Sequence, residues 1–584
     1  MLSFVPLAGV LSAALFAGFG RCAPSSSSSS QSDALGVRGP GSCHTPSNRA
    51  CWSTGFDINT DYDTNTPAGT LRTFNWEVTE HDNWTGPDGR VKSKVMLVNN
   101  QYPGPTLTAD WGDTVVINIK NSLRLNGTSF HWHGIRQFRT NIMDGTNGVT
   151  ECPIPPGTTK TYKFRLTQYG TTWYHSHFSA QYGNGVVGAF VINGPASLPY
   201  DIDLGPYPIN DYYLKTADEI VLDTQRSPAP PPSDNILFNG TNINPAGSGG
   251  AYSRITLTPG KRHRLRLINP SAEHNYQVSI VGHDMTVIAT DLVPVNSYTT
   301  NSVFLGVGQR LDVTIDASKT PGNYWMNVSL PASGLCGSSL NPAPAAILHY
   351  SSVPNGIPTN PGTPPPDSGC RDSLNYVPIV QRQVSLSQFT PGLQNTLDVT
   401  VDTSPLVFWK INGTSIDVDW DRPVLDYVLQ GNTSYPASEN VVIVNQKDVW
   451  TFWVIENLSI VPHPIHLHGH DYLVLGASAT GAGTFTAADK ASLKSANPTR
   501  RDVSMLPGNG WLVLAFKADN PGNWLLHCHI AWHISGGMSV DFLERVSEQK
   551  AQISSADLKA YNNNCAAWRN YFDHSGLHKI DSGL

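Results

Sequence analysis

The stretch His527-Cys528-His529-Ile530-Ala531-Trp532-His533 decides how the rest of this 584-residue sequence is interpreted. Side chains alternate faces along an extended strand, so His527 and His529 are expected to point one way and Cys528 the other. One short segment can therefore serve two metal sites. Cys528 and His533 supply two thirds of a trigonal His₂Cys set, which is typical of blue-copper electron-transfer centres. A lone Cys-x-His would more often be a buried cysteine beside ordinary histidines, but this chain contains further histidine clusters.

Three further clusters contain histidines spaced two residues apart, so both rings of each pair face the same side of a strand. They are His131-Trp-His133, His175-Ser-His177 and His463-Pro-Ile-His466-Leu-His468. With His527 and His529, the four pairs provide eight imidazoles, enough for a cluster of three coppers. His463 and His533 bring the number of proposed metal ligands to ten of the 19 histidines. Any single pair is equally well explained by two ordinary histidines on a strand, but the whole set is not.

In this order, the four motifs resemble those of multicopper oxidases, in particular laccases of the ascomycete type. The resemblance extends over nearly the whole chain after about residue 43. It implies an all-β fold of three cupredoxin-like Greek-key β-sandwich domains. It also implies four copper ions: one type 1, one type 2 and a type 3 pair.

The resemblance assigns a ligand set to each copper. The type 1 copper is expected at His463, Cys528 and His533, and the type 2 copper at His131 and His466. One type 3 copper is expected at His133, His175 and His529, and the other at His177, His468 and His527.

The implied reaction is one-electron oxidation of phenols and aromatic amines at the type 1 copper, coupled to four-electron reduction of O₂ to water. The residues agree with it, because Cys528 is bonded through the backbone to both His527 and His529, which gives a short path between the two sites. One alternative is a related oxidase with another donor, such as bilirubin, ascorbate or Fe(II). A second is a copper-binding electron carrier without oxidase activity. The carrier would need only the cysteine site, so the eight further ligands disfavour it.

Met538 lies ten residues after Cys528, where the resemblance places the axial ligand of the type 1 copper. Leu or Phe is more common there in relatives from filamentous fungi. A thioether is a weak donor that stabilises Cu(II) and lowers the redox potential. The alternative is that Met538 only fills space in the core.

Two aspartates are candidates for proton transfer. Asp291 aligns by resemblance with the carboxylate that takes the proton of the phenol, and Asp144 is a candidate proton donor near the three-copper cluster. Each could instead be an ordinary turn residue. The resemblance further implies that the segment Asp581-Ser-Gly-Leu584 inserts toward the cluster, the alternative being a frayed terminus.

Length and composition predict several domains and small-molecule partners. The chain is too long for one core, and its 51 Gly and 43 Pro suit a turn-rich all-β protein. With a net charge of −7 and no basic stripe, no nucleic-acid partner is expected. We also expect no membrane partner, and a monomer that takes phenolic or aromatic amine donors and O₂.

Composition shifts divide the chain into five parts. Residues 1–40 read as a signal peptide and propeptide, because the apolar run Leu2 to Phe19 precedes a serine-rich stretch. A membrane anchor is the alternative for this run. Residues 41–197, 198–355 and 395–584 are expected to be the three domains, with 356–394 as a linker. The first domain would hold type 2 and type 3 ligands, the second none, and the third the remaining ligands. The three-copper cluster would therefore be built across an interface.

Local patterns predict particular elements of these domains. Strands are expected at 95–98, 114–119, 186–192, 264–268 and 310–315, and a closing helix at 556–570.

Cysteines and sequons predict a secreted, extracellular glycoprotein. Apart from Cys22 in the targeting region and Cys528, six of the eight cysteines remain, enough for three disulfides. The resemblance implies the pairs Cys43–Cys51, Cys152–Cys565 and Cys336–Cys370. N-glycans are expected, and seven sequons could accept them, beginning at Asn83, Asn126, Asn239, Asn327, Asn412, Asn432 and Asn457.

Overall fold

Alternation of buried and outward-facing side chains places the strands of this chain in sandwiches. In β6 (Thr114–Asn121), Val115, Ile117 and Ile119 are buried while the residues between them face outward, as expected for a strand with one face on a core. The structure is a computed structural model that describes residues 41–331, 333, 335–389 and 395–584. The predicted signal peptide and propeptide, with Cys22, lie outside the described residues.

The first sandwich consists of two four-stranded sheets. One has the order β4 (Val91–Val98), β3 (Leu71–Thr85), β6, β8 (Thr159–Arg165), and the other β5 (Gly104–Asp110), β10 (Val187–Asn193), β9 (Gly170–His175), β7 (His131–Trp132). Val78 and Ile117 from one sheet and Leu107 and Phe190 from the other share one apolar cluster. A short hairpin, β1 (Cys51–Ser53) and β2 (Phe56–Asp57), precedes them, and the 3₁₀ turns η1 (Asn141–Met143) and η2 (Gln181–Asn184) lie in the connections.

The second sandwich has a six-stranded and a five-stranded sheet. The six-stranded sheet runs β12 (Asn235–Phe238), β11 (Ile202–Tyr212), β14 (Arg262–Ile268), β19 (Arg310–Asp316), β16 (Met285–Thr290), β17 (Val293–Thr300). The five-stranded sheet runs β13 (Arg254–Leu257), β21 (Ala345–Tyr350), β20 (Asn323–Ser329), β15 (Tyr276–Ile280), β18 (Ser302–Leu305). Helix α1 (Ala217–Thr224) begins at a capping box formed by Thr216 and Glu219, which satisfies the free N–H groups of its first turn.

The third sandwich repeats this arrangement. Its six-stranded sheet runs β23 (Phe408–Ile411), β22 (Thr396–Asp402), β25 (Trp450–Asn457), β30 (Gly510–Lys517), β27 (Tyr472–Ala477), β28 (Arg500–Arg501). The five-stranded sheet runs β24 (Val441–Val444), β32 (Ser539–Glu544), β31 (Gly522–Cys528), β26 (His463–Leu467), β29 (Val503–Leu506). The remaining elements are α2 (Val424–Gln430), α3 (Ala531–Ser535), α4 (Val546–Gln552), α5 (Ser555–Ser575), η4 (Leu386–Gln388), η5 (Ala437–Glu439) and η6 (Asp489–Ser492).

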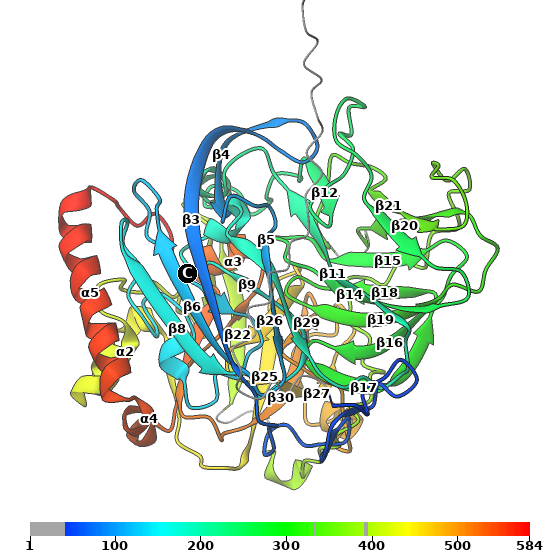
Figure 1. The fold of residues 1–584 in the computed structure, drawn as a ribbon. Coiled ribbons are helices and arrows are strands. Elements are labelled where there is room, and N and C mark those ends of the chain that lie inside the picture. The colour runs from blue at the N-terminus through cyan, green and yellow to red at the C-terminus, as the bar shows by residue number, and fades with distance from the viewer. Residues whose placement is uncertain (1–40, 332, 334, 390–394) are drawn as a thin grey trace, which may run out of the picture. The chain divides into compact units, whose positions relative to one another are not determined.

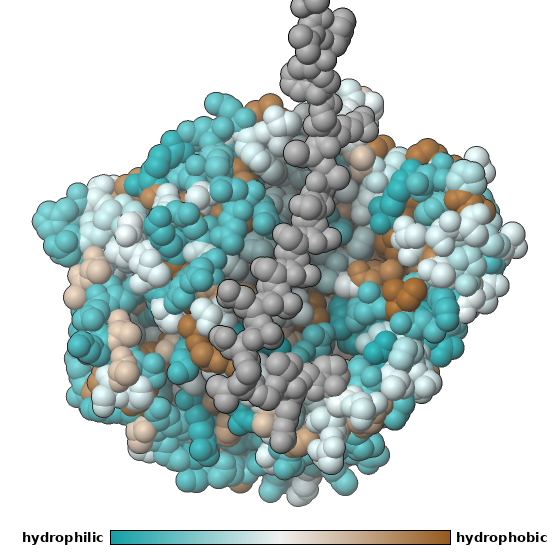
Figure 2. Space-filling model, viewed as in Figure 1, coloured by the Kyte–Doolittle hydropathy of each residue, from teal (hydrophilic) through white to brown (hydrophobic). Residues whose placement is uncertain are grey.

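The predicted fold class is confirmed: the described chain is all-β, with three cupredoxin-like sandwiches. Figure 1 shows the blue and cyan strands of the first beside the green strands of the second. The strands predicted from local pattern are present as β4, β6, β10, β14 and β19, and the predicted closing helix is α5. Figure 2 shows a mainly hydrophilic face with small groups of hydrophobic residues, as expected when apolar side chains fill the sandwich cores.

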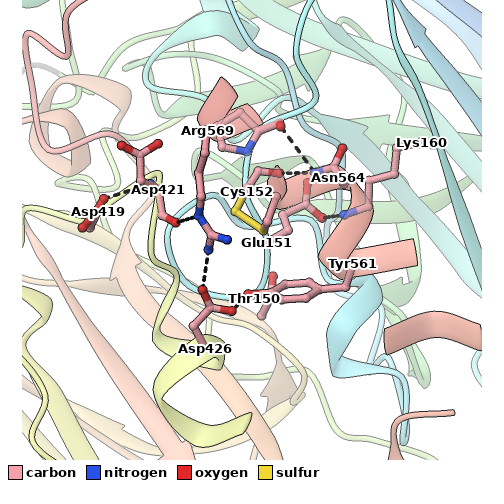
Figure 3. Close-up of a disulfide and its surroundings, with 12 residues drawn as sticks. Thr150, Glu151, Cys152, Lys160, Asp419, Asp421, Asp426, Tyr561, Asn564 and Arg569 are labelled. Atoms are coloured by element: carbon pink, nitrogen blue, oxygen red, sulfur yellow. Dashed lines mark hydrogen bonds and ion pairs between the residues drawn. A yellow bond between two sulfur atoms is a disulfide. The ribbon is translucent and has the colours of Figure 1, made fainter. Parts of the chain in front are cut away.

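All three predicted disulfides are confirmed, and Cys528 is the one free cysteine among the described residues. The Cys152–Cys565 bridge joins a loop of the first sandwich to α5 across 413 residues of sequence. Figure 3 shows what surrounds it: Asn564 donates to the Cys152 carbonyl at 2.8 Å, and Arg569 and Tyr561 both donate to Asp426. Helix α5 therefore ties the first sandwich to α2 near the third.

Candidate metal centres

Each of the four histidine pairs straddles the end of a strand. The first histidine of every pair lies within β7, β9, β26 or β31, and the second lies just beyond that strand. His131 is directly opposite His175 in one sheet, and His466 is opposite His527 in another. Directly opposite residues bring their side chains within contact distance. The predicted strand placement is therefore right for the first member of each pair, while the second occupies the loop that follows.

The eight paired histidines form three groups whose ligand atoms lie within 4.8 Å of one another: His131, His133 and His466; His133, His175 and His529; His177, His468 and His527. The last two groups are the triples that the resemblance implies for the type 3 coppers, and the first contains the implied type 2 pair. Rings from different sandwiches stack directly, His131 on His468 at 3.8 Å and His133 on His466 at 3.9 Å between centroids. Both the first and the third sandwich thus contribute to one buried cluster.

Hydrogen bonds leave the outer ring nitrogens free to bind a metal. Nδ1 of His131, His175 and His466 each lies 2.8–2.9 Å from a backbone carbonyl oxygen. An Nδ1–H that donates to a carbonyl leaves the Nε2 lone pair for a metal. The Nε2 atoms of these three rings are buried and have no hydrogen-bond partner among the described residues. Burial and neighbouring imidazoles hold the pKa of His175 and His466 well below the usual value, so both rings are neutral, as metal ligands must be.

A second, smaller site contains the free cysteine. Nδ1 of His463 and Nδ1 of His533 lie 3.0 Å apart, and the Cys528 Sγ lies 3.5 and 3.4 Å from them. Burial lowers the pKa of His533 to about 3 and raises the pKa of the Cys528 thiol above its usual range. A bound cation must therefore displace the thiol proton. The donor set of two imidazoles and one thiolate fits copper.

Met538 is fully buried in the same apolar cluster as Cys528 and Trp532. Its backbone brackets the site, because its N–H donates to the His533 carbonyl at 2.9 Å and its carbonyl accepts from the Cys528 N–H at 3.2 Å. This neighbourhood suits either an axial ligand or a packing residue, and the axial role stays a prediction.

Asp144 lies against the histidine cluster. Its Oδ2 is 2.8 Å from Nδ1 of His468 and accepts from the Thr146 hydroxyl at 2.8 Å, while its backbone carbonyl bonds to His131. The structure thus brings Asp144 beside two proposed ligands, as the sequence suggested. Donation of a proton from it stays a prediction.

The surroundings of Asp291 differ from those of an exposed turn residue, and its role in proton transfer stays a prediction. Its carboxylate is 1% exposed and accepts from the backbone N–H groups of Arg310, Asp502 and Val503 and from the Arg501 guanidinium. Burial acts to raise the pKa of Asp291, but Arg501 and Arg310 outweigh it and the pKa is lowered. A buried carboxylate with a lowered pKa and several donors is poorly suited to accept a proton.

Sequence reasoning missed Asp502. Its carboxylate is held by both terminal nitrogens of Arg310 at 2.6 Å, its backbone carbonyl bonds to His466, and its Oδ1 lies 3.2 Å from Nε2 of His133. Like Asp144, it contacts two of the proposed ligands. The Arg500-Arg501-Asp502 run, which is unusual in a chain with 14% charged residues, could have drawn attention to it.

Sequence reasoning also missed Glu273, which lies in the loop Asn269–Asn275 between β14 and β15. Glu273 as a residue is partly exposed, and its carboxylate accepts from the Tyr213 hydroxyl at 3.0 Å and interacts with the indole of Trp532, the neighbour of His533. Burial and then the charge of Asp211 raise the pKa of Glu273 to about 8. No local motif marks this glutamate.

The segment Asp581-Ser-Gly-Leu584 is packed into the protein, so the frayed-terminus alternative is wrong. The Ser582 N–H donates to the Ser535 carbonyl at 2.9 Å, and Asp581 accepts from the Ser179 hydroxyl at 2.8 Å. Ser535 and Ser179 each lie two residues from a proposed ligand. Insertion toward the cluster itself stays a prediction.

Comparison with known proteins agrees with this arrangement. Three family models described as multicopper oxidase match residues 79–197, 205–353 and 395–548. The chain is 57% identical over 557 residues to Laccase-1 of Melanocarpus albomyces, covering 93% of this chain and 89% of that protein. It is 56% identical over 559 residues to Laccase-2 of Podospora anserina, covering 93% and 90%. Among solved structures it resembles the laccase from Botrytis aclada at 39% identity and a TM-score of 0.85, covering 92% of this chain and 99% of that one.

Proposed function

The chain belongs to the multicopper oxidase family, and on that premise we propose that it removes single electrons from phenols and aromatic amines and reduces O₂ to water. Its cofactors are four copper ions: one type 1, one type 2 and a type 3 pair. The observation that carries the proposal is the presence of two buried ligand sets linked by His527-Cys528-His529. A carrier of single electrons would need only one of them.

We assign the type 1 copper to His463, Cys528 and His533, and the other three coppers to the eight paired histidines. When bound, copper supplies a one-electron redox couple at the first set and the four-electron reduction of O₂ at the second. The protein fixes the rings through the carbonyl bonds described above and keeps them neutral through burial. Cys528 provides the covalent connection between the sets. Asp144, bonded to His468, is the candidate to hold a proton for the O₂-reducing side.

The donor side needs a base, because losing an electron makes a phenol strongly acidic. We propose Glu273 for this role in place of Asp291. Glu273 is partly exposed and its carboxylate lies beside Trp532, next to the proposed ligand His533, whereas Asp291 is fully buried and bonded to Arg501. With a pKa raised to about 8, Glu273 is a stronger base than an ordinary carboxylate, and it is increasingly ready to accept a proton as the pH rises toward that value.

Replacing the base should affect only donors that release a proton. Glu273→Gln is expected to lower kcat/KM for a simple methoxyphenol by about 10²-fold, the usual contribution of general base catalysis. It should also remove the rise of kcat/KM between pH 6 and 8. Oxidation of hexacyanoferrate(II), which carries no transferable proton, should stay within about twofold and serves as the control. Equal losses with both donors would remove Glu273 from proton transfer.

The axial role of Met538 can be tested through the redox potential. Met538→Leu removes a weak donor that favours Cu(II), so the potential of the type 1 copper should rise on the order of 60 mV, a tenfold change in relative affinity for a one-electron couple. Met505→Leu is the matched control, because Met505 is equally buried but packs beside the Cys336–Cys370 bridge. Redox titration that finds the two variants alike would make Met538 a packing residue.

We propose that the protein is secreted and acts as a monomer without nucleic-acid or membrane partners. Three disulfides suit an oxidising compartment. No helix in the described part of the chain is long and apolar enough to span a membrane.

N-glycans are proposed at six of the sequons but not at Asn457, which is 2% exposed and whose amide donates to the carbonyls of Val461 and Pro507.

The choice of donor is tested by oxygen uptake with a methoxyphenol, ascorbate, bilirubin and Fe(II) in parallel. The phenol should give the highest kcat/KM, as expected for a relative of laccases. Faster turnover with one of the other three would establish the alternative donor.

A further inference from the structure

We propose that Asp211 is a positioning residue for the proton acceptor Glu273: its carboxylate binds the backbone of the loop that carries Glu273 and places a second negative charge beneath it. The inference rests on the proposed role of Glu273. Asp211 lies near the end of β11, and its side chain points into the protein, where it is 6% exposed.

Three consecutive backbone N–H groups point at this one carboxylate. Ala272 donates to Oδ1 at 2.8 Å, and Glu273 and His274 donate to Oδ2 at 2.8 and 3.3 Å. Successive N–H groups of this kind form a concave site that favours an anion. Because each bond restrains the backbone of the loop, together they set the direction in which the Glu273 side chain leaves it.

The same loop is joined to the type 1 site on its other side. The Ala531 N–H, at the start of α3, donates to the Ala272 carbonyl at 2.7 Å. Tyr213, two residues after Asp211, donates to the Glu273 carboxylate at 3.0 Å. One short segment, 211–213, therefore holds both the backbone and the side chain of Glu273 against the helix that carries His533.

The charges around the pair explain how Asp211 acts on the glutamate. Burial and the Asp211 charge raise the pKa of Glu273, while Tyr213 and Trp532 oppose the rise. Burial raises the pKa of Asp211 itself to about 6, opposed by the three N–H groups and by the buried Lys92 on β4. His274, held neutral by burial, adds no charge, and the Tyr276 phenol on β15 stays protonated because burial and Asp211 raise its pKa. Asp211 is thus the anion whose charge raises the pKa of Glu273.

Two variants separate charge from placement. Asp211→Asn removes the charge, so the acidic limb of the kcat/KM profile for a methoxyphenol should move to lower pH by about one unit, the size of shift that a close like charge produces. Asp211→Glu keeps the charge but displaces the loop, so the limb should stay while kcat/KM falls about tenfold, mainly through kcat, as small misplacements of reacting groups cause. Asp218→Asn is the matched control: it also faces Lys92 but makes no bond to the loop, and its profile should match the parent's.

The outcomes are distinct. An unmoved limb in Asp211→Asn, or a moved limb in Asp211→Glu, overturns the inference. So does an equal loss with hexacyanoferrate(II) and phenol in either variant, because that is what a general structural defect would give. If Glu273→Gln keeps the parent's limb, the proposed base itself is wrong. If Glu273→Gln removes the limb and Asp211→Asn leaves it in place, only the role of Asp211 fails.

Discussion

Cys528→Ser is expected to abolish the intense blue absorption of the copper-loaded protein and to reduce turnover with every donor to background. The band requires a thiolate bound to Cu(II), and a serine hydroxyl does not ionise to replace it. The fold should persist, because serine is nearly the same size and the side chain lies in a rigid, fully buried site. Absorption spectra, copper content per chain and oxygen uptake measure the three effects. The copper content should fall from four to three.

Ile530→Val provides the matched control for this experiment. Ile530 belongs to the same buried cluster as Cys528, and removing one methylene there costs only about 0.5–1.5 kcal/mol without touching a ligand. This variant should stay blue and active. A Cys528→Ser protein that retained both properties would place the blue site elsewhere in the chain.

Arg310→Leu should have the largest effect on stability. The Arg310 guanidinium is completely buried, bonds to Asp502 through both terminal nitrogens and lies 3.7 Å from Asp291. Removing it leaves buried carboxylates without their partner, which typically costs about 3–5 kcal/mol. Asp502 also supports His466 through its carbonyl, so copper retention should fall as well. Differential scanning calorimetry and dialysis against a copper chelator measure the two losses.

The comparison is Arg262→Leu, which breaks an Arg–Asp pair in the same sheet of the second sandwich. Arg262 and Asp316 are 35% and 56% exposed, so their pair should contribute no more than about 1 kcal/mol. If the two variants denatured at the same temperature and retained copper equally, the buried Arg310–Asp502 pair would contribute no more to stability or copper binding than the exposed pair does.

The metal-binding part of this architecture could be predicted because its information is local. Each histidine pair spans only three residues, and Cys528 lies between two histidines in sequence. Alternation along a strand predicts which side chains of a pair share a face, and the resemblance carried by the four motifs implied how the pairs group around each copper. The second histidine of each pair lies beyond the strand end, which a periodic pattern cannot show because it does not mark where pairing stops.

The surroundings of the candidate proton-transfer residues could not be predicted, because they come from distant parts of the chain. The residues around Asp291 in the sequence offer it no cationic partner, yet Arg501, 210 residues later, bonds to it. Glu273 looked ordinary, yet its surroundings come from Asp211, Tyr213 and Trp532 on other elements. The acidity of a carboxyl group depends on such tertiary neighbours, so local sequence could not show how the two carboxylates differ.

The way the ligands are divided between sandwiches also constrains biosynthesis. His133 and His529, whose ring nitrogens meet at 3.2 Å, are 396 residues apart. At roughly 5–20 residues per second, a ribosome needs tens of seconds to travel between them. The three-copper cluster therefore cannot be complete until the third sandwich has been synthesised, and the Cys152–Cys565 bridge can close only later still. Metal supplied early in synthesis meets at most four of the eight imidazoles, so a fully loaded protein requires copper to be present once the chain is complete.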